Sequence, residues 1–236
     1  MIVGVSTPAD RHAGVDKATG AADSADLDTA LARFVLDLRS RGLRDLGLLA
    51  AFEKTPRAAF LPKHLAPLTY QPFALPIDCG GEATAPQMVA TLLGALHLRP
   101  GMKVLDVGTG SGFQAAVLAR YGCKVVTIER FRTLHLAAGR AMLRQQVVNV
   151  RLEHGDGTAG FEAEAPYDRI LVNAAMKDVP DALVEQLAPG GSLAIPIQQG
   201  RDQKLLVFDD MGETYRQRDL GHCTFQAMVA GIPLVL

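Results

Sequence analysis

The sequence predicts an α/β domain built around one doubly wound, mostly parallel sheet with helices on both of its faces. Two observations lead to this prediction. From Leu98 onward, short apolar segments alternate with helix-like segments, a pattern typical of right-handed βαβ units. The first apolar segment, KVLDVG, runs directly into a glycine-rich turn, and such turns join a strand to a helix at the ligand-binding edge of this kind of sheet.

The part of the chain before this core follows a different pattern. Residues 1–28 mix Ala, Gly, Asp and Ser without an apolar period, so we expect a flexible N-terminal tail there. Apolar residues recur at helical spacing in residues 27–43, and residues 43–55 form a second helix-like segment. A third apolar helix is expected from Pro86 onward, after the segment CGGEATAP. Together these segments predict a helical cap on the sheet.

Within the core, the expected elements follow one another in a regular order. Strands are expected at residues 103–108, 124–129 and 150–157, with helices at 112–122 and 134–146 between them. A strand at 168–175, a helix at 181–188 ended by PGG, and a strand at 192–197 come next. The pattern closes with an antiparallel pair of C-terminal strands near 204–210 and 224–229.

Composition narrows the class of protein. A chain of 236 residues with 48% hydrophobic residues can bury one core of ordinary size. The 24 basic residues balance 25 acidic ones without forming a basic cluster, so nucleic acid is not an expected partner. The 3 cysteines are too widely spaced for a metal site or disulfide framework, and no apolar run approaches the roughly 18 residues of a membrane span. We therefore expect a cytoplasmic monomer without a metal or a membrane anchor.

Three of the expected strands end in glycines or acidic residues at the same edge of the sheet. Gly108, Gly110 and Gly112 follow the first strand and let the backbone turn tightly beside a ligand. Glu129 ends the second strand, 17 residues beyond Gly112, where a carboxylate can accept both hydroxyls of a ribose. Asp156 follows the third strand, where its carboxylate can accept a hydrogen bond from the amino group of an adenine. Together these strand ends predict an adenosine site.

The spacing of these residues indicates which adenosine cofactor is bound. A dinucleotide fingerprint needs glycine at position 113, which is Phe113 here, and no phosphate-binding P-loop is present. The remaining pattern, D-x-G-x-G-x-G, adds the negative charge of Asp106, which suits a cationic ligand such as a sulfonium. It resembles the motif of S-adenosylmethionine-dependent methyltransferases, which have a Rossmann-like fold. We therefore expect S-adenosylmethionine as the cofactor. The residues expected to bind it are Asp106, Gly108, Thr109, Gly110, Gly112, Glu129, Asp156 and Gly157.

Several separated segments of the chain carry a more specific resemblance. They are TPRAAFLP, ALPI, VLDVGTGSGFQAAVLA, HGDGTAGFEAEAPYDRILVNAA and LAPGGSLAIPI. These segments resemble those of one narrower family, the protein-L-isoaspartate O-methyltransferases. They occur in the family's order, and the resemblance extends from Leu31 to the end of the chain. It implies a single methyltransferase domain at residues 29–236, with a helical cap and acceptor-site loop at 29–97 and a cofactor-binding α/β core at 98–236.

The resemblance implies methyl transfer to the α-carboxyl group of L-isoaspartyl residues in damaged proteins and peptides. Such a carboxyl group has a reference pKa of about 3.5, so it is ionised at neutral pH and needs no general base. Catalysis then depends on positioning. In the family, a serine hydroxyl of the loop G-x-G-Q-T-I-S-Q-P lies beside the acceptor, and Thr84 takes its place here. We name Thr84 and Asp106 as catalytic residues. Thr84 is also a candidate N-cap for the following helix, and Asp106 is also a candidate structural acid that binds loop amides.

Departures from the family pattern in this loop leave two alternatives open. The departures are Cys79, Gly81, Glu82, Ala83 and Ala85. Glu82 places a negative charge near a site that accepts a carboxylate, unless its side chain points into solvent. One alternative is a methyltransferase with another carboxylate or a small molecule as acceptor. The other is a non-catalytic protein that binds the cofactor and has lost the acceptor site.

Overall fold

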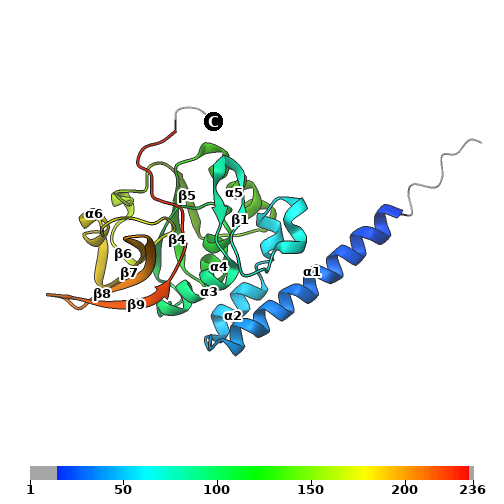
Figure 1. The fold of residues 1–236 in the computed structure, drawn as a ribbon, viewed down its shortest axis with the longest axis horizontal. Coiled ribbons are helices and arrows are strands. Elements are labelled where there is room, and N and C mark those ends of the chain that lie inside the picture. The colour runs from blue at the N-terminus through cyan, green and yellow to red at the C-terminus, as the bar shows by residue number, and fades with distance from the viewer. Residues whose placement is uncertain (1–14, 234–236) are drawn as a thin grey trace, which may run out of the picture.

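The computed structural model describes residues 15–233, with side chains from residue 25, and its central feature is a seven-stranded sheet (Figure 1). The strand order is β5-β4-β3-β6-β7-β8-β9. The strands are β3 (Lys103–Val107), β4 (Lys124–Glu129), β5 (Val150–His154), β6 (Tyr167–Val172), β7 (Leu187–Gln199), β8 (Asp202–Asp210) and β9 (Tyr215–His222). Pairs among the first five are parallel, and β8 and β9 add antiparallel partners at one edge. The predicted fold class is confirmed.

The winding of the chain places a crevice beside β3. From β3 the chain moves outward to β4 and β5, then crosses back to the other side of β3 and forms β6 and β7. Strand order therefore reverses between β3 and β6. In an open α/β sheet, the ligand crevice lies outside the carboxyl ends of the strands at such a switch point.

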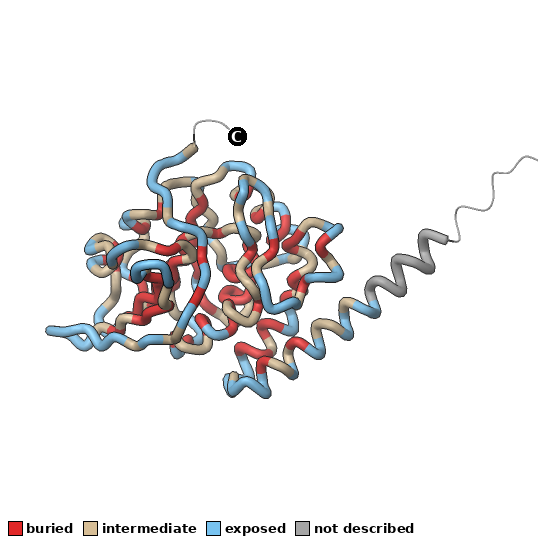
Figure 2. Tube along the Cα trace, in the orientation of Figure 1, coloured by how far each residue is buried: buried red, intermediate tan, exposed pale blue. Residues whose placement is uncertain are grey.

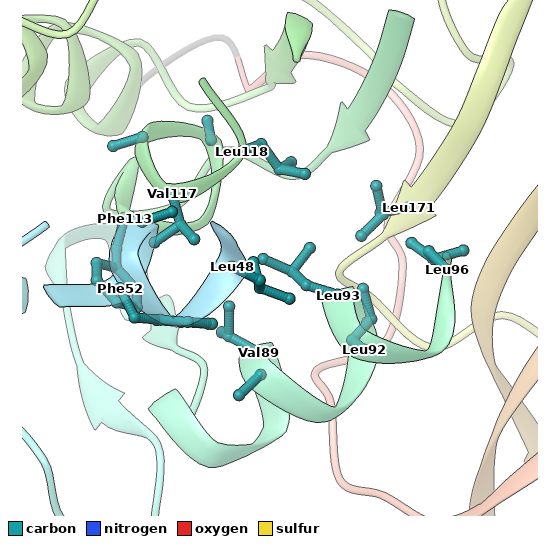
Figure 3. Packing of buried hydrophobic residues seen from close by; sticks show 14 of the residues in the cluster. Leu48, Phe52, Val89, Leu92, Leu93, Leu96, Phe113, Val117, Leu118 and Leu171 are labelled. Atoms are coloured by element: carbon teal, nitrogen blue, oxygen red, sulfur yellow. The ribbon is translucent and has the colours of Figure 1, made fainter. Parts of the chain in front are cut away.

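Helices cover both faces of the sheet. They are α2 (Leu46–Glu53), α3 (Pro86–Ala95), α4 (Phe113–Tyr121), α5 (Arg132–Arg144) and α6 (Asp181–Val184). Successive strand residues point to opposite faces: Val104 joins the larger core cluster under α2, α3 and α4, whereas Leu105 joins the smaller cluster under α6. Figure 3 shows the larger cluster, where Leu48 of α2 lies among residues from α3 and α4.

The long helix α1 (Val15–Ser40) packs on this body only near its end (Figures 1 and 2). Phe34 and Leu38 are buried, and Phe34 meets Phe52 edge to face with ring centroids 5.9 Å apart. The predicted tail ended at residue 28, whereas the helix already begins at Val15; residues 1–14 lie outside the described residues. A helix that is already formed and packed at Phe34 extends more easily than a new helix nucleates, which accounts for its continuation toward the N-terminus.

Two other expectations at the C-terminal side are corrected. The helix expected at 181–188 ends at Val184, because Leu187 already pairs with Tyr167 of β6. The pairing then skips to Ser192, so the PGG segment forms an irregularity inside β7 and does not end a helix. The last antiparallel strand is β9, formed earlier in the chain than the expected residues 224–229. Those residues instead form one parallel bridge, between Ala227 and Ala175.

Short elements complete the cap and the loops. They are the 3-10 helices η1 (Arg57–Phe60), η2 (Lys63–Leu68), η3 (Asp78–Gly80) and η4 (Glu162–Glu164), and the two-stranded ladder of β1 (Leu75–Pro76) and β2 (Glu82–Ala83). The ladder holds the segment that precedes α3 close to the switch point. Across residues 15–233, no helix combines the length and the apolar character that crossing a membrane requires.

Candidate active site

A cavity of about 350 Å³ opens at the carboxyl ends of β3, β4, β5 and β6. This volume lies within the usual range of about 300 to 1,000 Å³ for small-molecule sites. Three segments form its walls: the glycine-rich loop after β3, the loop between β1 and α3, and residues 226–229 near the C-terminus. The cavity therefore lies at the switch point of the sheet.

Glycines shape the loop between β3 and α4. Gly108 and Gly110 have φ angles of 90° and 52°, in the left-handed region that disfavours other residues, and both line the cavity. Gly112 also has a positive φ angle but lies behind the loop: a Cβ there would approach Met142 Cε to 3.0 Å and Ala138 Cβ to 3.1 Å. Gly112 thus lets α5 pack beneath the loop and is not among the residues that line the cavity, and its predicted contact with the cofactor stays a prediction.

Glu129 connects the glycine loop to the end of β4. Its Oε2 accepts a hydrogen bond of 2.9 Å from the amide of Gly110, and its Oε1 accepts one of 3.0 Å from the amide of Phe131. Glu129 is buried and lines the cavity. Since each carboxylate oxygen has two lone pairs, the side chain still has acceptor capacity for the hydroxyls of a ribose. Thr109, which also lines the cavity, is held by a 2.7 Å contact between its hydroxyl and that of Thr127.

Asp106 lies behind the cavity wall and is completely buried. Its Oδ1 accepts hydrogen bonds from Gln114 Nε2 at 2.7 Å and Asn173 Nδ2 at 2.8 Å, and its Oδ2 accepts one from Thr127 Oγ1 at 2.9 Å. Burial raises the pKa of this carboxyl to about 6, against the opposing effect of these hydrogen bonds. Of the two roles left open for Asp106, a ligand-facing acid and a structural acid, its place behind the cavity wall favours the structural one. Its hydrogen bonds join β3 to β4, to α4 and to the residue that follows β6.

Gln114 and Asn173 were missed by the sequence reasoning, although both lie in motifs that it used. Both line the cavity in front of Asp106, and Gln114 Nε2 also donates to Asn173 Oδ1 at 3.0 Å. The signal was an amide immediately after the glycine loop and another at the end of a buried strand. Each presents polar atoms at the carboxyl edge of the sheet.

Asp156 and Gly157 form the floor of the cavity beside β5. Asp156 accepts hydrogen bonds from the amides of Thr158 and Gly231, so it also fixes the C-terminal segment. A Cβ at Gly157 would lie 2.7 Å from Val107 Cγ1, which is closer than real Cβ contacts allow. Glycine is therefore required here for the loop to pass the end of β3.

The loop between β1 and α3 forms the opposite wall. Thr84 is half-buried and lines the cavity. The expectation that Thr84 caps α3 is wrong, because the N-cap residue is Ala85 and no described side chain caps this helix end. Glu82 is exposed at the cavity rim. The C-terminal segment holds this loop, since Gln226 Nε2 donates to the carbonyl oxygen of Gly80 at 2.6 Å.

Arg57 is a third residue that sequence reasoning left without a role. Its side chain is completely buried and lines the cavity. Nη2 donates to the carbonyl oxygens of Ala83 at 3.1 Å and Thr84 at 2.9 Å, and Nη1 donates to that of Thr69. Burial lowers the pKa of the guanidinium to about 10, which leaves it charged at neutral pH. The available signal was a single basic residue within the apolar segment TPRAAFLP.

Comparison with protein families gives a match over nearly the whole described chain. Residues 31–232 match the family model described as protein-L-isoaspartate(D-aspartate) O-methyltransferase. This range includes the cap, the whole sheet and every wall of the cavity. The chain belongs to this family.

Individual protein-L-isoaspartate O-methyltransferases are similar over most of their length. The protein of that name from Azorhizobium caulinodans is 45% identical over 209 residues, which cover 87% of this chain and 95% of the relative. The one from Methylorubrum populi is 44% identical over 87% of this chain and 97% of the relative. A solved protein-L-isoaspartate O-methyltransferase is 27% identical with a TM-score of 0.76, over 86% of this chain and 67% of that one. A Plasmodium falciparum structure, at 23% identity and a TM-score of 0.73 over 84% of this chain and 97% of that one, shares the fold.

The structure of this family member brings most of the predicted site residues together. Those that line this same cavity are Thr84, Gly108, Thr109, Gly110, Glu129, Asp156 and Gly157. Asp106 and Gly112 stand behind the cavity wall. The acceptor-site loop and the cofactor motif, which are separated along the chain, therefore face a shared space.

Proposed function

We propose that this chain transfers a methyl group from S-adenosylmethionine to the α-carboxylate of L-isoaspartyl residues in damaged proteins and peptides. The observation that carries the proposal is the shared cavity of Thr84 and the predicted cofactor residues. Family membership supports it, because the relatives from Azorhizobium caulinodans and Methylorubrum populi are named for this activity.

The residues of the cavity fit the proposed cofactor. Glu129 would accept hydrogen bonds from the ribose hydroxyls with its remaining lone pairs. Asp156 would accept a hydrogen bond from the amino group of the adenine. The positive φ angles of Gly108 and Gly110 allow the backbone to pass close to the ligand. When bound, S-adenosylmethionine supplies an electrophilic methyl group.

The work of the protein on the acceptor is positioning. The α-carboxylate is already ionised at neutral pH, so no base must remove a proton from it. The Thr84 hydroxyl would donate a hydrogen bond to one carboxylate oxygen and leave the other free to accept the methyl group. Orientation of this kind contributes about 7 to 11 kcal/mol in well-ordered reactions.

The altered loop is compatible with this acceptor. Glu82, the departure that most opposes a carboxylate, is exposed at the rim, where solvent weakens its repulsion. Thr84 retains a hydroxyl inside the cavity, which argues against loss of the acceptor site. A different carboxylate acceptor stays an alternative that the same assay addresses.

The decisive experiment offers the protein two peptides that differ only in one linkage, L-isoaspartyl or normal aspartyl. Radiolabelled S-adenosylmethionine reports methyl transfer, and calorimetry reports cofactor binding. We expect label on the isoaspartyl peptide alone. Tight cofactor binding without label on either peptide would reject the proposed acceptor, and absence of binding would reject the cofactor assignment.

We further propose that the enzyme acts as a monomer in the cytoplasm on exposed, flexible segments of its protein substrates. The cysteines support the cytoplasmic location, because Cys79, Cys123 and Cys223 form no disulfide among the described residues, as a reducing compartment favours. Sedimentation equilibrium at micromolar concentration should give the mass of one chain; a dimer mass would refute the monomer.

A further inference from the structure

Arg57 carries a buried charge for which the described residues supply no counter-ion. The ion pairs among these residues do not include Arg57. Its guanidinium donates only to backbone carbonyl oxygens, and its Nε is buried without a hydrogen-bond partner in the described chain. Removing an arginine from water without a counter-charge is costly, so this arrangement requires an explanation.

The charged residues that line the cavity come from different elements. Glu129 and Asp156 lie at the cofactor end, after β4 and β5, whereas Glu82 of β2 is exposed at the rim, two residues before Thr84. Arg57 lies at the other end, bonded to the carbonyl oxygens of Ala83 and Thr84. The remaining cation of the lining, Arg130, directly follows Glu129 and belongs to the cofactor end. The acceptor end thus has one buried positive charge, which is bonded to the main-chain carbonyl oxygen of Thr84.

A guanidinium is suited to recognising a carboxylate. It is planar, stays charged at neutral pH even when buried, and offers several N–H donors in fixed directions. Arg57 is held by Thr69 on one side and by Ala83 and Thr84 on the other, so its charge keeps a constant relation to Thr84. Its Cζ also lies 5.9 Å from the centre of the Phe113 ring at the start of α4. This anchoring gives a preorganised positive field at the acceptor end.

We propose that Arg57 determines specificity for an anionic acceptor: the positive field of its buried guanidinium at the Thr84 end of the cavity favours the binding of an acceptor carboxylate over that of a neutral group of the same shape. An incoming carboxylate would supply the missing counter-charge. The inference rests on the proposed function for the identity of the acceptor. It assigns to the chain a recognition residue that acts on binding and is separable from cofactor affinity.

The test compares two peptides that contain the same isoaspartyl linkage, one with the α-carboxylate and one with an α-carboxamide. Calorimetry measures the affinity of each for protein saturated with S-adenosylhomocysteine, which also stabilises the fold by mass action. We expect the wild-type protein to bind the carboxylate peptide at least tenfold more tightly. In Arg57→Gln the affinities for the two peptides should differ by less than twofold. The affinity of this variant for S-adenosylhomocysteine should stay within threefold of the wild-type value.

A matched control and a second variant keep the result interpretable. Arg169 is also buried and donates to carbonyl oxygens, including that of Leu96 at 2.6 Å, but it does not line the cavity. Arg169→Gln should lower stability and leave the carboxylate preference at the wild-type value. Arg57→His is neutral at pH 8.5, where it should lack the preference, and it provides the measurement if Arg57→Gln does not fold.

Each outcome separates this inference from the proposed function. A wild-type preference that persists in Arg57→Gln, or in Arg57→His at pH 8.5, would overturn the role of Arg57. A wild-type protein without any preference would overturn it as well. Methylation is measured on the same wild-type samples: absence of label on the isoaspartyl peptide, with the carboxylate preference intact, would reject the proposed function and leave the role of Arg57 in place.

Discussion

The buried carboxyl of Asp106 predicts an unusual dependence of stability on pH. Its pKa is raised from an ordinary 3.8 to about 6, with burial as the largest cause. Between these two values the folded protein retains a proton that the unfolded chain has released, so raising the pH through this range favours unfolding. Each pKa unit is about 1.4 kcal/mol. Ionisation of Asp106 should therefore cost about 3 kcal/mol of folding free energy, fully present above about pH 7.

Asp106→Asn should remove this cost while preserving the local hydrogen bonds. The new Oδ1 can accept from Gln114 and Asn173, as the carboxylate oxygen does now. The new amide can donate to Thr127 Oγ1, whose hydroxyl hydrogen can then turn toward Thr109. The stability of the variant relative to wild type should rise by about 2 kcal/mol between pH 4 and pH 7, since part of the full effect lies below pH 4.

Urea unfolding followed by circular dichroism measures this difference at several pH values and constant ionic strength. Subtracting the two proteins cancels the other titrating groups, because both proteins contain them. Asp178→Asn, at an exposed position, serves as the control and should keep a constant difference from wild type. A stability difference for Asp106→Asn that stays level from pH 4 to pH 7, or falls, would refute the argument from burial.

Three further substitutions test the cavity. Thr84→Val should reduce methylation of an isoaspartyl peptide more than tenfold with cofactor affinity within twofold, and Thr84→Ser should restore it; unchanged turnover in Thr84→Val would remove the hydroxyl from the mechanism. Glu129→Ala should weaken cofactor binding about tenfold or more by calorimetry, because hydrogen bonds to a charged acceptor contribute about 1.5 to 3 kcal/mol; an unaltered dissociation constant would contradict its role. Gly157→Ala should lower the free energy of unfolding by about 1 to 3 kcal/mol through overlap with strand ends, whereas Gly139→Ala, with ordinary contacts in α5, should raise it by up to about 1 kcal/mol. Equal thermal shifts for the two glycine variants would show that the space at Gly157 is not limiting.

The cofactor half of the site was predictable because it depends on local order along the chain. In parallel strands joined by right-handed crossovers, every carboxyl end lies on the same edge of the sheet. Residues that directly follow such strands, as Gly108, Glu129 and Asp156 do, must therefore converge. Knowing where each strand ends was enough to place them together.

The other half depends on contacts between distant segments. Arg57 is separated from Thr84 by 27 residues and meets it only because β1, β2 and η1 fold against the sheet. Whether Asp106 faces a ligand or the interior also depends on Gln114, Thr127 and Asn173, which come from three different elements. A pattern of residue types along the chain does not contain these distances.

The sequence by itself determined the doubly wound sheet, the position of the glycine loop and the acidic strand ends, since periodicity and turn chemistry act over a few residues. Only the tertiary structure decided which polar groups face the cavity and which support its wall. It placed Asp106 behind the cavity and Arg57 beside Thr84. The physical reason is that burial and electrostatic environment are properties of the packed chain, because they depend on every element that surrounds a group.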